Sequence, residues 1–95
     1  MRLTPHQHQT IKKHFLEIFQ EGEIFLFGSR VADTKRGGDI DLYLVVPDLK
    51  GLAIKRVEFL VALKRDIREQ KVDVVFDRGQ NRAIDQIAKE QGVKL

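Results

Sequence analysis

The sequence predicts an α/β fold of the α+β type, a small mixed β-sheet of about three core strands flanked by helices. Three short apolar segments, at residues 23–28, 39–46 and 71–76, have the length and composition of strands. Longer segments with apolar residues at helical spacing precede, separate and follow them. The expected order is therefore helix, strand, loop, strand, helix, strand, helix.

The composition indicates one globular domain over residues 1–95. Apolar residues make up 42% of the chain and charged residues 33%, proportions typical of a folded protein rather than a disordered one. The sequence has no apolar run of roughly 20 residues, no secretory signal and no cysteine, so we expect a cytoplasmic protein without a membrane partner. Its net charge of +3 is compatible with a polyanionic ligand such as a nucleotide but does not require one.

The first helix opens with a capping signal. Thr4 is expected as the N-cap, Pro5 as the first helical residue and Gln7 as the capping-box partner. Gly22 is a plausible stop for this helix. Its apolar residues follow at helical spacing: Ile11, Phe15, Ile18 and Phe19.

Two further helices are expected, one after Gly51 and one that stops near Gly92. The helix after Gly51 is long and amphipathic, and it carries Ile54, Val57, Leu60, Val61, Leu63 and Ile67. The last helix carries Ile84, Ile87 and Ala88.

The connection lengths predict which strand ends meet. A helix joins the second and third strands, which favours a parallel pair with a right-handed crossover. About ten residues join the first and second strands, which suits antiparallel neighbours. The end of the first strand and the starts of the other two then share one edge of the sheet, which brings together Gly28, Ser29, Asp39, Asp41 and Asp73.

Three carboxylates at that edge point to a metal site. Asp39 and Asp41 are two residues apart on a strand and project from one face, and Asp73 adds a third carboxylate from the neighbouring strand. Carboxylates this close repel one another unless a cation neutralises them. Mg²⁺ prefers oxygen ligands, and three carboxylates can hold two such ions roughly 4 Å apart, as in phosphoryl displacement.

The loop before the aspartates suits the same chemistry. A glycine at position 28 lets backbone N–H groups approach a phosphate, and the Ser29 hydroxyl adds a donor. Arg30, Lys35 and Arg36 could neutralise a triphosphate or its pyrophosphate leaving group, and spacing does not say which of them does so.

Each feature also has a structural alternative. Taken alone, Asp39 would be a turn or cap residue and Asp73 a surface residue. Asp77 is an alternative to Asp73 as the third carboxylate, because both residues are expected on the same face of the strand. The three histidines, His6, His8 and His14, are expected at the surface rather than in a metal site, because His6 and His8 do not share a helix face. The co-occurrence of a Gly-Ser pair with three converging carboxylates favours the functional interpretation.

The stretch "GSRVADTKRGGDIDL" resembles the signature of the DNA polymerase beta-like nucleotidyltransferase superfamily in its minimal (MNT) form. The resemblance implies a nucleotidyltransferase fold and an enzyme that uses Mg²⁺ to transfer a nucleoside monophosphate, AMP from ATP in the leading case. It implies that Gly28, Ser29 and Arg30 bind the nucleotide and that Asp39, Asp41 and Asp73 are the metal-binding and catalytic carboxylates, with Asp73 helping to activate the acceptor hydroxyl.

The same resemblance implies a partner. Minimal transferases often pair with a helical HEPN protein in toxin–antitoxin modules, where the transferase is the antitoxin and the acceptor lies on the toxin.

This chain differs from the common "GSRARG" form at Val31, Ala32 and Asp33. That difference supports an alternative, a non-catalytic antitoxin or interaction module that neutralises its partner by binding. A homo-oligomer also stays open, whereas a nucleic-acid-binding domain lacks a helix-turn-helix or stacking motif.

Overall fold

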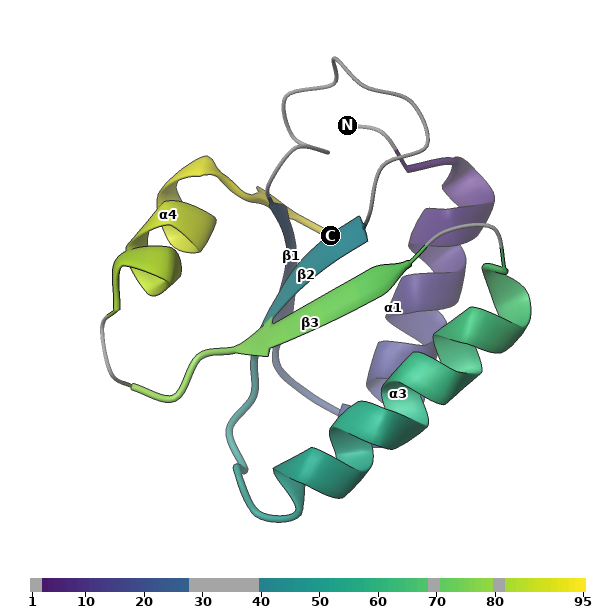
Figure 1. The fold of residues 1–95 in the computed structure, drawn as a ribbon, viewed down its shortest axis with the longest axis horizontal. Coiled ribbons are helices and arrows are strands. Elements are labelled where there is room, and N and C mark those ends of the chain that lie inside the picture. Colours follow the sequence, from purple (N-terminus) through teal and green to yellow (C-terminus); the bar gives the residue numbers. More distant parts are fainter. Residues whose placement is uncertain (1–2, 28–39, 69–70, 80–81) are drawn as a thin grey trace.

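The computed structural model describes residues 3–27, 40–68, 71–79 and 82–95. Along the chain the elements are α1 (Pro5–Phe19), β1 (Glu23–Phe27), β2 (Ile40–Val45), α3 (Leu52–Asp66), β3 (Val72–Phe76), α4 (Ala83–Gln91) and β4 (Val93–Lys94). Helices α1 and α3 lie side by side against one face of the sheet, and α4 lies apart from them (Figure 1). The predicted mixed sheet flanked by helices is confirmed.

The sheet has the strand order β3-β2-β1-β4. Strands β1 and β2 are antiparallel, and β2 and β3 are parallel, as the connection lengths predict. The short β4 pairs with the end of β1 and adds a fourth strand to the three expected ones. A strand of two residues is too short to show alternation in the sequence, so the sequence does not predict β4. The strand pairs with β1 because the chain returns to the edge of the sheet after α4.

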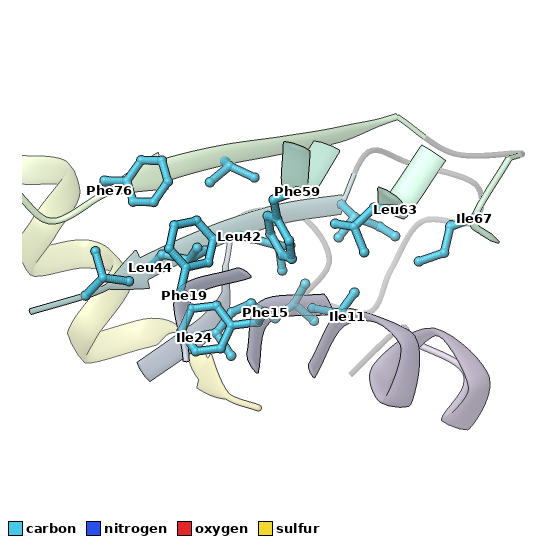
Figure 2. Close-up of a cluster of buried hydrophobic side chains, with 14 of the residues drawn as sticks. Ile11, Phe15, Phe19, Ile24, Leu42, Leu44, Phe59, Leu63, Ile67 and Phe76 are labelled. Atoms are coloured by element: carbon cyan, nitrogen blue, oxygen red, sulfur yellow. The ribbon is translucent and has the colours of Figure 1, made fainter. Parts of the chain in front are cut away.

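The hydrophobic core lies between the sheet and the pair α1 and α3 (Figure 2). At its centre the Phe59 ring contacts Phe15 and Phe19 edge-on, with ring centroids 6.5 and 5.7 Å apart. Leu42 and Leu44 of β2 close the core from the sheet side and are fully buried. Phe15 and Phe19 are core residues, as their helical spacing predicts, whereas Phe59 is not among the apolar residues expected on its helix.

The start of α1 follows the predicted capping box. The Gln7 backbone N–H donates to the Thr4 hydroxyl at 3.1 Å, and the Thr4 backbone N–H donates to the Gln7 side-chain oxygen at 3.0 Å. The helix ends three residues before Gly22, because Gln20 closes it with a positive φ of 71°. Gly22 is still required at its position, since a Cβ there would lie 2.3 Å from the Val45 carbonyl oxygen.

The helix α3 differs from the expectation of a single apolar face. Phe59 and Leu63 point into the core, as does Ile67 directly after the helix, whereas Ile54, Val57 and Val61 are more than half exposed. The apolar residues therefore fall on two opposite sides of this helix. None of the helices in the described ranges is long and apolar enough to cross a membrane.

Candidate functional site

The edge of the sheet where β1 ends and β2 and β3 begin brings two of the predicted carboxylates together. Asp41 lies directly opposite Asp73 in the parallel register of β2 and β3. On its other side Asp41 is paired with Phe27, the last residue of β1. The predicted convergence of these three strand ends is confirmed for the residues that the structure describes.

Both aspartates belong to the face of the sheet that points away from α1 and α3. Their strand neighbours Leu42 and Val74 are buried in the core on the opposite face, and strand alternation puts Asp41 and Asp73 on the other side. Both carboxylates are half-buried. Adjacent strands are about 4.8 Å apart, so two like charges in register repel each other.

A cation would relieve this repulsion, and the donor set fits a hard divalent ion. Two carboxylates on one face of neighbouring strands supply the oxygen ligands that Mg²⁺ accepts together with water and phosphate oxygens. Within the described ranges, no group of three or more His, Cys, Asp or Glu residues could hold a metal. The predicted third ligand, Asp39, lies outside those ranges, as do Gly28, Ser29 and Arg30.

Asp77, the rival of Asp73 in the sequence, has a structural role. Its carboxylate accepts a hydrogen bond from Lys89 Nζ at 2.8 Å and one from the Gly79 backbone N–H at 2.9 Å. The hydrogen bond from Lys89 holds the pKa of Asp77 below its usual value. Asp77 follows the end of β3, four residues along the chain from Asp73, and so lies away from the paired carboxylates.

His14 is less exposed than its sequence pattern predicts. Its two ring nitrogens lie 3.0 Å from a Glu17 carboxylate oxygen and 2.8 Å from an Asp66 carboxylate oxygen. The second contact joins α1 to α3, and His14 holds the pKa of Asp66 below its usual value. His14 therefore has a structural role, and the expectation that it is not part of a metal site stands for the described residues.

A buried polar network that no sequence motif indicates lies beneath the same face. The Tyr43 hydroxyl donates to Asp85 Oδ1 at 2.8 Å, and both side chains are almost completely buried. Arg82 binds the two oxygens of Asp85 through Nε and Nη2, each at 3.0 Å, and its backbone N–H donates to Oδ2 at 2.7 Å. Arg82 Nη2 also donates to the Phe76 carbonyl at 2.8 Å.

This network fixes α4 to the strand that carries Asp41. Arg82 holds the pKa of Asp85 far below its usual value, and burial raises the pKa of Tyr43, so the pair is a carboxylate and a neutral phenol. The only signal in the sequence is an acidic residue in the first turn of a helix, three positions after Arg82. Nothing local indicates that its partner is Tyr43, 42 residues earlier.

The mixed sheet and the helices packed on one of its faces match the nucleotidyltransferase fold. The model of the nucleotidyltransferase domain family matches residues 8–93, and the chain belongs to this family. No curated protein sequence matches the chain.

Solved structures of toxin–antitoxin complexes contain chains with the same fold. A toxin–antitoxin structure with AMP-PNP matches with 28% identity and a TM-score of 0.74, over 90% of this chain and 69% of the other. A mutant of the MntA–HepT toxin–antitoxin matches with 26% identity and a TM-score of 0.76, over 99% and 72%. A tri-AMPylated HEPN toxin with its MNT antitoxin from Shewanella oneidensis matches with 26% identity and a TM-score of 0.69, over 93% and 67%.

Proposed function

We propose that this chain is a single-domain, Mg²⁺-dependent nucleotidyltransferase that transfers AMP from ATP to a hydroxyl group of a partner protein. In this proposal it acts in the cytoplasm as the antitoxin of a HEPN/MNT-type pair, and the partner is a helical HEPN-type toxin. Membership of the nucleotidyltransferase family supports the reaction class. The similar chains from complexes with AMP-PNP and with an AMPylated toxin support the nucleotide and the acceptor.

The observation that carries the proposal is the register of Asp41 opposite Asp73. A protein that needs only a stable sheet does not benefit from two like charges on adjacent strands. The pair is useful where a cation and a phosphate must be held between them. With Asp39 they would hold Mg²⁺, which when bound would stabilise the charge that develops on the phosphate oxygens and on the leaving group.

The remaining chemistry is assigned to the chain's own residues. Gly28, Ser29 and Arg30 would bind the triphosphate. Asp73 would accept the proton of the acceptor hydroxyl as its oxygen forms a bond to the α-phosphorus. The bond from that phosphorus to the oxygen bridging to the β-phosphate breaks, and pyrophosphate leaves. The products are an AMP ester of the acceptor and free pyrophosphate.

The first test is ATP binding by isothermal titration calorimetry, with and without Mg²⁺. We compare the wild-type protein with Asp41→Asn/Asp73→Asn and with Glu21→Gln/Glu90→Gln, which removes two carboxylates from exposed positions. Mg²⁺-dependent binding should be present in the wild type and in the control and absent in the first variant. Equal binding by all three proteins would contradict the proposed metal site.

A second assay separates catalysis from binding. Labelled ATP, Mg²⁺ and a HEPN-type toxin that this chain binds should give label on that partner with the wild type and none with Asp41→Asn/Asp73→Asn. The alternative function, a non-catalytic antitoxin, is favoured by the departure from the family pattern at Val31, Ala32 and Asp33. It predicts that the carboxylate variant still neutralises the toxin.

A further inference from the structure

The start of α4 forms a side-chain bridge between the two strands that carry the paired carboxylates. On one side the Asp85 carboxylate accepts a hydrogen bond from the Tyr43 hydroxyl of β2 at 2.8 Å. On the other side Arg82 Nη2 donates to the carbonyl of Phe76, the last residue of β3, at 2.8 Å. An ion pair between Arg82 and Asp85 at 3.0 Å completes the connection. We name this chain of contacts, from Tyr43 through Asp85 and Arg82 to Phe76, the α4 bridge.

The α4 bridge lies close to the carboxylates along both strands. Tyr43 is two residues after Asp41 on the same face of β2, and Phe76 is three residues after Asp73 on β3. At about 3.3 Å per residue, the bridge lies about 7–10 Å from the carboxylate pair. The Tyr43 ring also contacts Phe27, the strand partner of Asp41, with ring centroids 6.4 Å apart. A displacement of Tyr43 therefore moves the backbone that carries Asp41.

Strand β3 is the strand that charge repulsion would displace. Among the described residues it has a strand neighbour on one side only, because it is the outermost strand of the sheet. The like charges of Asp41 and Asp73 push it outward, where no further strand in the described ranges opposes the movement. The α4 bridge opposes it, since Arg82 holds the end of β3 and Tyr43 anchors the same contacts to β2.

Burial and a second contact make this bridge rigid. Tyr43 and Asp85 are almost completely buried, so water does not compete for the hydrogen bond between them. Both oxygens of Asp85 accept hydrogen bonds, since the Arg82 backbone N–H donates to Oδ2 at 2.7 Å. Further along α4, Lys89 Nζ lies 2.8 Å from the carboxylate of Asp77, the residue after β3. Helix α4 is therefore held to β3 at two points.

We infer that the α4 bridge positions the paired carboxylates for Mg²⁺ binding. Tyr43 and Arg82 are then positioning residues, which act on the site through β2 and β3 and do not touch the substrate. The inference rests on the proposed function, because it concerns the metal site proposed there. A bridge that keeps Asp41 and Asp73 at a constant separation lets a cation bind without having to draw the two strands together.

The test compares the Mg²⁺ requirement of ATP binding in the wild-type chain and in Tyr43→Phe, which removes the hydroxyl from the bridge and keeps the ring. Calorimetric titrations with ATP at a series of Mg²⁺ concentrations give the concentration for half-maximal binding. Circular dichroism selects a temperature at which every variant is folded. We expect Tyr43→Phe to raise that Mg²⁺ concentration about tenfold, as do changes in outer groups that orient metal ligands.

The control for lost stability is Leu63→Ala, which shortens a fully buried side chain of α3 in the core on the opposite face of the sheet. It should cost at least as much stability as Tyr43→Phe but leaves the α4 bridge intact. Its Mg²⁺ requirement should equal that of the wild type.

Arg82→Lys tests the other end of the bridge. The substitution keeps a positive charge beside Asp85 but removes the planar guanidinium that binds Asp85 and the Phe76 carbonyl together. It should raise the Mg²⁺ requirement in the same direction as Tyr43→Phe.

Amide hydrogen exchange in the metal-free protein gives an independent measurement. The Ile40 backbone N–H donates to the Lys71 carbonyl at 2.8 Å, at the end of β2 and β3 that carries the carboxylates. Tyr43→Phe should accelerate exchange of this amide more than Leu63→Ala does, because only the first substitution releases the two strands locally.

The outcomes separate this inference from the proposed function. A raised Mg²⁺ requirement in Tyr43→Phe and Arg82→Lys, but not in Leu63→Ala, supports it. An equal rise in Leu63→Ala, or no rise in Tyr43→Phe, overturns it and leaves the proposed transferase intact. Exchange at Ile40 that is no faster in Tyr43→Phe than in Leu63→Ala also overturns it. If the wild type does not bind ATP in the presence of Mg²⁺, the proposed metal site and this inference fail together.

Discussion

Tyr43→Phe should destabilise the protein through a single lost hydrogen bond. The Tyr43 hydroxyl is fully buried and donates to the Asp85 carboxylate at 2.8 Å. Removing the hydroxyl leaves the ring in place, so its contacts with Phe25 and Phe27 persist. Asp85 keeps its hydrogen bonds from Arg82 but loses one donor in a site without solvent access.

The expected magnitude follows from the charge on the acceptor. Arg82 holds the pKa of Asp85 far below its usual value, so the lost bond is one to an ionised group at neutral pH. Hydrogen bonds to charged groups contribute about 1.5–3 kcal/mol. In a domain of this size that corresponds to a decrease in melting temperature of about 6 °C or more.

Urea denaturation and thermal melting of the wild type and of Tyr43→Phe measure this effect. The same substitution in an Asp85→Asn background is the control, because an amide oxygen accepts a weaker hydrogen bond and the cost of Tyr43→Phe should shrink. Equal stability of Tyr43→Phe and the wild type would refute the network as an anchor of α4. An equal cost in both backgrounds would refute the assignment of the cost to this hydrogen bond.

Three further predictions concern the paired aspartates, acid stability and α3. Asp73→Asn should raise the metal-free stability by up to about 1 kcal/mol by removing a like-charge pair, and it should abolish stabilisation by Mg²⁺ in urea titrations. Since the pKa of Asp85 is lowered in the folded protein, its contribution to the free energy of unfolding is complete above about pH 4 and decreases as the pH falls. The free energy of unfolding of Asp85→Asn, measured by urea denaturation, should therefore change less with pH in the acid range than that of the wild type. Phe59→Ala should cost about 3–5 kcal/mol, whereas Val57→Ala should change stability by less than about 0.5 kcal/mol; similar costs for both would contradict the two-sided assignment of α3.

The sequence predicts the geometry of the carboxylate edge because the relevant information is local. Strand alternation separates Asp41 from Ile40 and Leu42, and the lengths of two connections determine which strand ends meet. A parallel pair joined by one helix then places the starts of both strands together. The register of Asp41 with Asp73 agrees with that reasoning.

The features that the sequence does not predict depend on tertiary contacts. The apolar residues of α3 satisfy a helical period on both sides, and periodicity alone does not say that Val57 is exposed while Leu63 is buried. Asp85 reads as a helix-cap residue, and its bond to Tyr43 exists only because α4 packs on the second face of the sheet. The strand β4 is too short to show a pattern of its own.

The two faces of β2 explain how the fold tolerates its paired charges. On one face Asp41 repels Asp73, and on the other Leu42 and Leu44 pack fully buried beside Val74 and Phe76 in the same register. The buried pairs and the ladder hydrogen bonds hold β2 against β3 more strongly than two half-exposed carboxylates push them apart. Beyond the carboxylates the same face is held by Tyr43 and α4, so the repulsion is confined to the end of the sheet. The carboxylate pair that we propose as part of a cation site can therefore form without a bound cation.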